Sequence, residues 1–370
     1  MSNSKKHERT VLQMNLSGLI KLSNKYGKDP ELVLGGGGNT SEKDEEVLYV
    51  KCSGTSLATI DENGFVPVSR TALDATLNKN YPTDDKGREA AFLADVMAAR
   101  TMPGETRRPS VEALLHNLFP QRYVVHLHPA LVNGLTCGKA GEAKLKELFG
   151  ESVVWVPVTR PGYVLGKLCY DVLREYKNKT GKDVQLAFLE NHGIFVAADT
   201  EEEIETLITK SMSLLQSVVT YVPNQEYSTA VAPDVIAQIK DKTGFSCIEF
   251  RTNPQILEYL KGVDAAADLL LPFTPDQIVY CGAYPTYIKC ISELDSNLPD
   301  KILFVENMGI FALGQTEKGT NLAIEVFLNA VDIAVYAKNF GGVQPLAEDF
   351  IDFIATWEAE SYRQKEAKKG

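Results

Sequence analysis

The first 220 residues alternate between segments with helical and with strand-like spacing of their apolar positions. Apolar residues recur at helical spacing in residues 11–26, 87–100, 111–118, 166–176 and 201–219. Strand-like segments lie between them, namely a short apolar run at 32–34 and residues 46–52, 123–128 and 186–196. The glycine-rich stretch 35–41 follows the first of these and is expected to form a loop. This mixture of strands and helices predicts a layered α/β domain.

The second half of the chain repeats part of the first. Residues 186–201 read LAFLENHGIFVAADTE and residues 302–317 read ILFVENMGIFALGQTE, with eight of the 16 aligned positions identical. His192 of the first copy is replaced by Met308, and no histidine follows position 192. The second copy therefore cannot build a histidine metal site. We expect it to have a structural role or to cover the site of the first copy.

Composition narrows the classes of partner. With 44% hydrophobic and 24% charged residues, the chain has the balance of a globular protein with a substantial core. A net charge of −11 argues against a general nucleic-acid surface, so an anionic ligand would need a local site. Six cysteines without a C-x-x-C pair indicate reduced thiols and a cytoplasmic location.

The chain ends and the longest apolar runs indicate no membrane partner. Residues 1–9 are polar and basic, unlike a signal peptide, and residues 363–370 are expected to be a solvated, lysine-rich tail. No segment approaches the roughly 20 consecutive apolar residues that a membrane span requires.

Three of the five histidines have the spacing of a metal site. His126 and His128 are two residues apart in a predicted strand, so their side chains project from the same face. With His192 they could supply three neutral imidazoles to a tetrahedral zinc ion and leave its fourth position open. The alternative is that His126 and His128 are ordinary, partly buried residues. For His192 the alternative is a strand-end turn in which Gly193 supplies a positive φ, which is compatible with a ligand role.

Several loops could hold an anion. The glycines of 35–41 allow close backbone approach and a nest of N–H groups, or simply a flexible turn. This loop matches neither G-x-G-x-x-G nor the Walker pattern. Ser53-Gly54-Thr55, with Lys51 beside it, follows a predicted strand and is a second possible phosphate contact. Ser110 could cap the following helix or bind phosphate.

Glu112 lies near the start of a predicted helix, and His116 lies one turn later on the same face. The simpler interpretation of Glu112 is a surface ion pair. The functional one is a carboxylate beside a metal, available as a general acid or base.

Taken together and in order, these segments resemble the class II aldolase/adducin family. The matching stretches are LVLGGGGNTSEK, YVKCSGTSL, RPSVEALLH, VVHLHP, VTRPGYVLG and FLENHGIFVAADT, within residues 15–220. The resemblance implies a three-layer α/β/α fold with a largely antiparallel central sheet, followed here by a C-terminal partial repeat. It also implies residue roles: His126, His128 and His192 as zinc ligands, Glu112 as the acid/base carboxylate, and Gly38, Asn39, Thr40, Ser53, Gly54 and Ser110 as contacts of the substrate phosphate.

The function implied is cleavage of a ketose 1-phosphate to dihydroxyacetone phosphate and an aldehyde, with one zinc or another divalent metal per subunit of a homo-oligomer. Alternatives are a sugar-phosphate epimerase, dehydratase or decarboxylase on the same metal site, or a non-catalytic adducin-like module. The resemblance divides the chain into a catalytic domain, residues 1–225, and a degenerate repeat without metal ligands, residues 226–370.

The tail half, including Pro272-Phe273-Thr274-Pro275-Asp276, resembles the extended aldolase portion of bifunctional rhamnulose-1-phosphate aldolase/alcohol dehydrogenases. Rhamnulose 1-phosphate is therefore a suggested substrate. No nucleotide-binding fingerprint occurs in the sequence, so no dehydrogenase half is expected within it. Residues 272–274 (PFT) also echo residues 157–159 (PVT), which we interpret as a further part of the repeat.

Overall fold

The computed structural model describes residues 14–296, 298 and 300–357. The predictions for residues 1–9 and 363–370, and for the first part of the helix expected at 11–26, lie outside the described residues.

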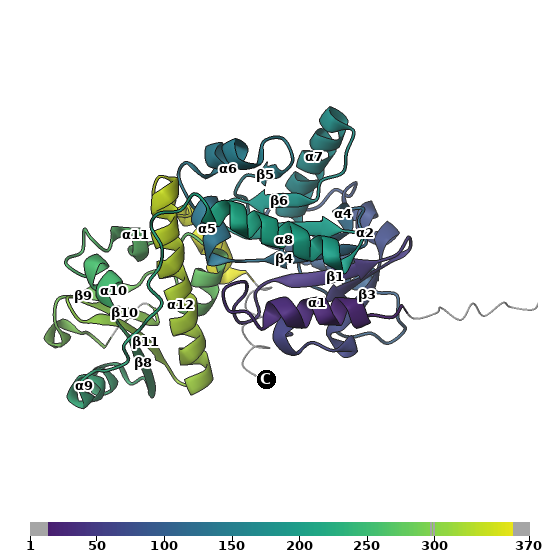
Figure 1. Ribbon diagram of the computed structural model, residues 1–370. Helices are drawn as coiled ribbons and strands as arrows, with labels where there is room; N and C mark the ends of the chain where they lie inside the picture. The colour runs from purple at the N-terminus through teal and green to yellow at the C-terminus, as the bar shows by residue number, and fades with distance from the viewer. Residues whose placement is uncertain (1–13, 297, 299, 358–370) are drawn as a thin grey trace, which may run out of the picture.

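The first part of the chain forms a seven-stranded sheet in the order β3-β2-β1-β4-β7-β6-β5 (Figure 1). Only β5 and β6 pair in parallel, and the other neighbours are antiparallel. The predicted, largely antiparallel central sheet is therefore confirmed. The strands are β1 (Asn39–Lys43), β2 (Val47–Lys51), β3 (Phe65–Ser69), β4 (Tyr123–Leu127), β5 (Val154–Val156), β6 (Leu186–Leu189) and β7 (Gly193–Ala198).

Helices cover both faces of this sheet, which gives the three layers. Strand β4 shows the reason, because its side chains alternate between the faces: Val125 and Leu127 belong to one core cluster and Val124 to another. The first face packs against α1 (Ser17–Gly27), α5 (Ala130–Thr136), α6 (Gly141–Phe149) and α8 (Glu201–Gln216). The second packs against α2 (Arg70–Thr76), α3 (Asp85–Ala98), α4 (Ala113–Leu118) and α7 (Tyr163–Thr180). Short 3-10 turns, η1 (Leu57–Thr59) and η2 (Glu62–Gly64), lie between β2 and β3.

The second part of the chain forms a four-stranded sheet in the order β8-β11-β10-β9. Its strands are β8 (Cys247–Arg251), β9 (Thr286–Ile288), β10 (Ile302–Val305) and β11 (Gly309–Gly314). The accompanying helices and turns are α9 (Pro233–Thr243), α10 (Pro254–Tyr259), α11 (Ala267–Leu270), η3 (Gln277–Cys281, a π-helical turn), η4 (Ile291–Glu293), α12 (Glu317–Ala337), η5 (Lys338–Phe340) and α13 (Glu348–Thr356).

The internal repeat extends through four strands. The set β4-β7-β6-β5 has the same order and the same pairing directions as β8-β11-β10-β9. Asn191 and Asn307, which join the hairpins, both have a positive φ, 56° and 53°. The backbone N–H of Asn191 donates to the carbonyl of Thr136, at the end of α5, the helix after β4. In the same way, the N–H of Asn307 donates to the carbonyl of Leu260, at the end of α10, the helix after β8. These matched hydrogen bonds show that the second unit is a partial copy of the first.

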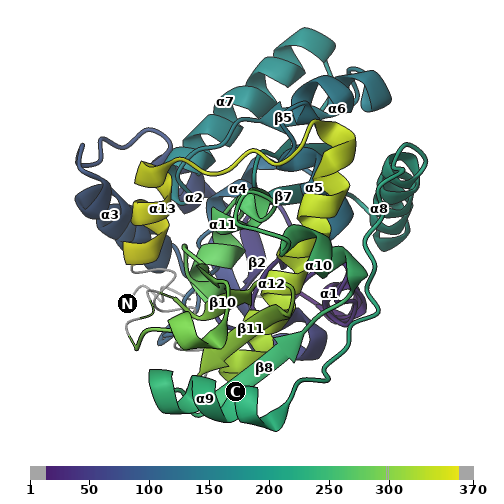
Figure 2. The same ribbon diagram turned by 90° about the vertical axis from the view of Figure 1, so that its left-hand side faces the viewer.

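Helix α12 lies between the two sheets (Figures 1 and 2). Its buried side chains join one continuous core that also contains residues of α5, β10 and β11. Residues Glu317–Phe340 are long and apolar enough to cross a membrane by length and composition, which the sequence analysis did not anticipate, but 78% of the apolar 18-residue window within this helix is buried inside the protein. That burial is typical of the core helix of a folded domain. All six cysteines are free thiols.

Four local predictions are wrong. The apolar run 32–34 forms no strand, and β1 begins after the glycines, at Asn39. The predicted single strand 186–196 is a hairpin of β6 and β7, and the positive φ in its turn belongs to Asn191 rather than to Gly193. The echo between 157–159 and 272–274 is not structural, because the former follows β5 whereas the latter precedes β9.

Candidate active site

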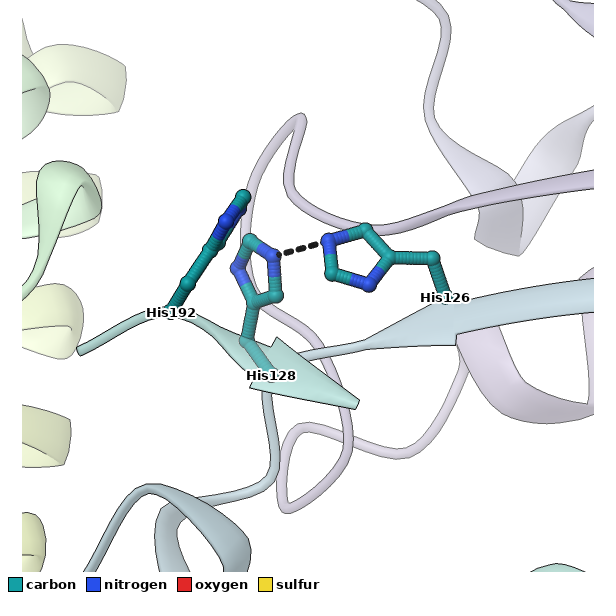
Figure 3. Close-up of side chains that lie close together, drawn as sticks. All are labelled: His126, His128 and His192. Atoms are coloured by element: carbon teal, nitrogen blue, oxygen red, sulfur yellow. Dashed lines mark hydrogen bonds between the residues drawn. The ribbon is translucent and has the colours of Figure 1, made fainter. Parts of the chain in front are cut away.

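The sheet register brings three histidines to one end of the first sheet. His126 is in β4, opposite Phe195 of β7, and His128 follows one residue after the strand ends. His192 lies in the turn that joins β6 to β7, so it reaches the same end. One ligating atom of each ring lies within 4.8 Å of those of the other two (Figure 3). The three imidazoles therefore form a cluster that could hold a metal ion.

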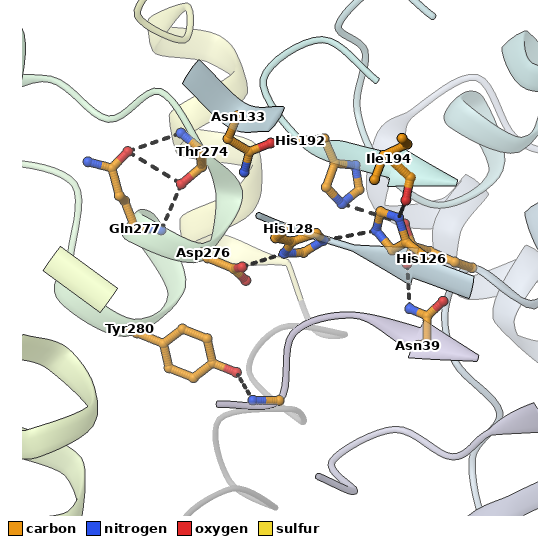
Figure 4. A network of polar contacts seen from close by, with 12 residues as sticks. Asn39, His126, His128, Asn133, His192, Ile194, Thr274, Asp276, Gln277 and Tyr280 are labelled. Atoms are coloured by element: carbon orange, nitrogen blue, oxygen red, sulfur yellow. Dashed lines mark hydrogen bonds and ion pairs between the residues drawn. The ribbon is translucent and has the colours of Figure 1, made fainter. Parts of the chain in front are cut away.

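The hydrogen bonds of two rings fix their tautomers. Nδ1 of His126 is 3.0 Å from the carbonyl oxygen of Ile194, which can only accept, so this nitrogen donates. Nδ1 of His128 is 2.6 Å from Oδ2 of Asp276 and donates to that carboxylate (Figure 4). In the neutral form of each ring Nε2 is left with a lone pair, and the two Nε2 atoms face each other at 2.9 Å.

Two facing lone pairs repel unless a proton or a metal ion lies between them. The cluster therefore fits a divalent metal: it offers neutral, oriented nitrogen donors. Two imidazole nitrogens on a tetrahedral zinc lie roughly 3.4 Å apart, given a Zn–N distance of about 2.0–2.1 Å. The rings need to open only slightly to reach that spacing.

Glu112 lies immediately before α4 and faces this cluster. Its Oε2 is 3.5 Å from Nε2 of His126, and its Oε1 is 3.6 Å from Nε2 of His192. Oε2 accepts a 2.6 Å hydrogen bond from Nδ2 of Asn39. Oε1 is buried and accepts no hydrogen bond from any residue in the described part of the chain. A buried carboxylate oxygen without a donor is available to a ligand in the pocket.

The surroundings keep Glu112 ionised and His126 neutral. Burial would raise the pKa of Glu112, whereas a positive charge on His126 or His192 and the hydrogen bond from the amide of Asn39 lower it. Burial lowers the pKa of His126 well below its ordinary value. A neutral imidazole is the form that binds metals.

A chain of hydrogen bonds behind the site orients Glu112. Ser41 is 2.7 Å from Nδ1 of His116, and Nε2 of His116 contacts Oδ1 of Asn39, whose Nδ2 in turn donates to Glu112. Burial lowers the pKa of His116 to about 3, so its ring is neutral and can donate from one nitrogen and accept at the other. Sequence reasoning gave His116 no role, although its position one turn after Glu112 was a signal.

The pocket beside the histidines contains most of the predicted phosphate contacts. Its lining residues are Gly36, Gly38, Asn39, Lys51, Ser53, Gly54, Ser110, Val111, Glu112, His128, Pro161, His192, Pro275 and Asp276. Gly38 has φ +60°, and a Cβ there would lie 2.8 Å from the carbonyl oxygen of His126, so only glycine fits this approach. The buried ammonium of Lys51, 3.3 Å from the carbonyl oxygen of Gly36, places a positive charge at the glycine loop.

Two of the predicted phosphate contacts need revision. Thr40 does not line the pocket: it is fully buried in β1, and its hydroxyl is 2.6 Å from that of Ser23 on α1. Successive side chains of a strand point to opposite faces of the sheet, so the side chain of Thr40 points away from the face to which Asn39 points. Asn39 lines the pocket, but its amide is already engaged with Glu112 and His116. Thr40 therefore cannot contact a ligand in this pocket, and Asn39 is mainly a hydrogen-bond partner of Glu112.

The second unit reaches the site, which sequence reasoning did not predict for any particular residue. Pro275 and Asp276 form part of the pocket wall. Asp276 accepts from His128, as described above, and the hydroxyl of Tyr280 accepts a 3.2 Å hydrogen bond from the N–H of Gly36. The repeat thus covers part of the site through three residues, Pro275, Asp276 and Tyr280.

A three-layer fold with three clustered histidines beside a buried carboxylate is the arrangement that the resemblance to class II aldolases implied. The family model described as "Class II Aldolase and Adducin N-terminal domain" matches residues 18–216. The chain belongs to the class II aldolase and adducin family.

The individual proteins that resemble this chain share little of its sequence. A curated relative named "Uncharacterized oxidoreductase YuxG", from Bacillus subtilis (strain 168), is 24% identical over 301 residues, or 73% of this chain and 42% of the relative. The chain thus spans less than half the length of that protein. The N-terminal class II aldolase domain of a conserved protein from Thermoplasma acidophilum is 28% identical, with a TM-score of 0.47, covering 59% of this chain and 98% of that one. L-fuculose-1-phosphate aldolase from Thermus thermophilus is 15% identical, with a TM-score of 0.36, covering 55% of this chain and 94% of that one.

Proposed function

We propose that the protein is a zinc-dependent aldolase that cleaves a ketose 1-phosphate to dihydroxyacetone phosphate and an aldehyde. The observation that carries this proposal is the cluster of three histidines, with the Nε2 atoms of His126 and His128 2.9 Å apart, beside a buried carboxylate with one oxygen that accepts no hydrogen bond. Neutral imidazoles held in this way are ligands for zinc, and another divalent metal could take its place.

The chain's residues would divide the chemistry between them. His126, His128 and His192 would hold the ion, which when bound supplies a Lewis acid for the negative charge that develops on the substrate's carbonyl oxygen. As the carbon–carbon bond breaks, the hydroxyl-bearing carbon becomes the aldehyde and its O–H loses a proton, while the carbon next to the carbonyl takes the bonding electrons and must gain one. Oε1 of the ionised Glu112 faces the pocket without a hydrogen-bond donor and would take up a proton and deliver it to that carbon.

The phosphate would bind at the other side of the same pocket. Lys51 supplies a positive charge, and Gly38, Ser53, Gly54 and Ser110 line the pocket next to it. Binding energy from this non-reacting end would orient the substrate over Glu112.

Product analysis tests the reaction type. We expect the purified protein, incubated with a panel containing rhamnulose 1-phosphate and fuculose 1-phosphate, to release dihydroxyacetone phosphate and an aldehyde from at least one of them. A stereoisomer formed without fragments would instead identify an epimerase, and loss of water or carbon dioxide a dehydratase or decarboxylase. Absence of bound metal and of any product would favour an adducin-like binding module.

Three further features belong to the same proposal. We assign residues 1–225 to the catalytic unit and 226–370 to the degenerate repeat, a division that falls between α8 and α9. We also propose a homo-oligomer, which light scattering of the purified protein tests, and a cytoplasmic location.

A further inference from the structure

One short segment of the second unit touches three separate parts of the site. This clamp segment, residues 273–280, runs from the end of the loop after α11 into η3. Figure 4 shows it opposite the histidines. The first unit builds the candidate metal site from its own side chains, so contacts from outside that unit require an explanation.

The first contact holds the turn that carries His192. Asn191, the residue before it, donates from Nδ2 to the carbonyl oxygen of Phe273 at 2.8 Å and to that of Gln344 at 2.9 Å. Asn191 has a φ of 56°, a conformation that residues other than glycine rarely adopt. The equivalent Asn307 has a φ of 53° in the copy, which lacks the histidine. The turn is therefore a property of the fold, and the clamp segment fixes its position at the site.

The second contact fixes a metal-facing ring. Oδ2 of Asp276 accepts from Nδ1 of His128 at 2.6 Å, which leaves the lone pair of Nε2 directed into the cluster. A carboxylate in this position also makes the imidazole a stronger donor to a cation. His126 achieves the same orientation with the carbonyl of Ile194, within the first unit. His128 depends for it on the second unit.

The third contact reaches the glycine loop. The hydroxyl of Tyr280 accepts from the N–H of Gly36 at 3.2 Å, and the ring lies close to Gly35. The carbonyl of Gly36 in turn is 3.3 Å from the ammonium of Lys51. Tyr280 thus holds the loop whose Gly36 carbonyl contacts Lys51, the positive charge proposed for the phosphate.

The clamp segment is itself rigidly built. Oε1 of Gln277, a buried residue, accepts from the backbone N–H groups of Phe273 at 2.9 Å and Thr274 at 3.1 Å. These bonds close a tight loop immediately around Asp276. A carboxylate on such a loop can orient a ring, because its own position is determined.

We propose that the degenerate repeat is a positioning element for the active site, in which Asp276 orients His128 for metal binding and Tyr280 holds the phosphate loop. Neither residue needs to touch the reacting atoms. This inference rests on the proposed function, because it assumes that the histidines bind a metal. It explains how a copy without histidines still contributes to the site.

The test for Asp276 measures zinc affinity without substrate. Metal-free protein is titrated with zinc against a chromophoric chelator, and the dissociation constants of wild type, Asp276→Ala and Asp276→Asn are compared. Loss of such a supporting partner typically weakens metal binding about 10–100-fold, which we expect for Asp276→Ala. Asp276→Asn should weaken zinc binding less, because the amide oxygen of the asparagine can still accept the hydrogen bond from His128. The exposed Asp264→Asn, on the same unit, is the matched control and should not change zinc affinity.

The test for Tyr280 uses inorganic phosphate as the probe. We expect Tyr280→Phe to weaken phosphate binding by about fivefold, the typical effect of one hydrogen bond, without changing zinc affinity. Tyr284→Phe, at a half-exposed ring outside the clamp segment, should change neither. Thermal unfolding of each metal-free variant shows whether it is folded as the wild type is.

The outcomes separate the two proposals. If wild type itself binds no zinc, the proposed function fails, and the clamp has no metal site to position. If wild type binds zinc and Asp276→Ala binds it equally well, the clamp inference alone is overturned. The clamp inference would also be overturned if Asp276→Asn and Asp276→Ala lost the same zinc affinity and both lowered the melting temperature of the metal-free protein. That result would mean that Asp276 has a merely structural role.

Discussion

Asp332 carries an unfavourable charge inside α12, the helix between the two units. Its side chain is buried, and it accepts hydrogen bonds from Nε2 of Gln225 and the hydroxyl of Tyr227, each at 3.1 Å. Burial raises the pKa of Asp332 from 3.8 to about 6; the two hydrogen bonds oppose the rise, and the charge of Glu31 adds to it. Folding therefore makes ionisation of this carboxyl harder.

The size of the effect follows from the shift. A rise of about two pKa units corresponds to about 3 kcal/mol, since one unit is 1.36 kcal/mol. Because the folded-state pKa is the higher one, this stability is fully present below the unfolded pKa of 3.8 and is lost as the pH rises through about 6. At pH 8 the folded state carries the whole cost.

Asp332→Asn removes the charge and keeps the shape. The introduced amide can still accept from Tyr227, but its NH2 group faces that of Gln225, which costs about 1 kcal/mol for the lost hydrogen bond. We therefore expect the variant to be about 2 kcal/mol more stable than wild type at pH 8 and about 1 kcal/mol less stable at pH 4.

Calorimetric unfolding of both proteins between pH 4 and pH 8 measures this crossover. The exposed Asp241→Asn is the control for removing a carboxylate from the surface. A difference between Asp332→Asn and wild type that stays the same at every pH would refute the reasoning, whatever its size.

Three substitutions test the site. His116→Ala should lower kcat by up to roughly 100-fold, because Asn39 and Glu112 lose their orientation; unchanged zinc content with normal kcat would show that the hydrogen-bond chain is dispensable. Gly193→Ala would place a Cβ 2.4 Å from the carbonyl oxygen of Leu127 and 2.8 Å from the ring of His128. Equilibrium dialysis should show zinc affinity reduced about tenfold or more, and wild-type affinity would mean that the turn yields easily. Lys51→Met should reduce kcat/KM for a phosphorylated ketose roughly 10–100-fold, because it removes a hydrogen bond to a charged group, and should leave kcat/KM for the unphosphorylated sugar unchanged. Equal losses for both sugars would mean that the phosphate binds elsewhere.

Helices with strong apolar periodicity were predictable from the sequence. The segments expected at 87–100 and 201–219 correspond to α3 and α8 within a few residues. The fold class followed from the order of motifs along the chain. The three histidines lie together, as the H-x-H spacing and the strand-end turn indicated, and their role as ligands stays a prediction.

Strand β1 shows why hydrophobic pattern alone was insufficient. Its sequence, NTSEK, is wholly polar, yet all five residues are buried between β2 and β4. Specific partners satisfy its side chains: Ser23 contacts Thr40, His116 contacts Ser41, and Arg122 pairs with Glu42. These partners come from distant segments, so no local pattern identifies the strand.

Asp276 and Tyr280 were unpredictable for a related reason. Asp276 contacts a histidine 148 positions earlier in the chain, and the contact exists only because α12 packs the second unit against the first. Sequence similarity drew attention to the run from Pro272 to Asp276 without indicating which of its side chains reaches the site. Only the three-dimensional arrangement distinguishes the carboxylate on His128 from its neighbours.

The most direct test of the central claim is a zinc titration of metal-free protein. The assay contains a ketose 1-phosphate that the zinc-loaded protein cleaves, and the signal is the release of dihydroxyacetone phosphate. We predict no release before zinc is added, a linear rise, and a plateau at one zinc per chain, with His126→Ala remaining inactive throughout. Release at the full rate from zinc-free protein, or from His126→Ala, would contradict the account.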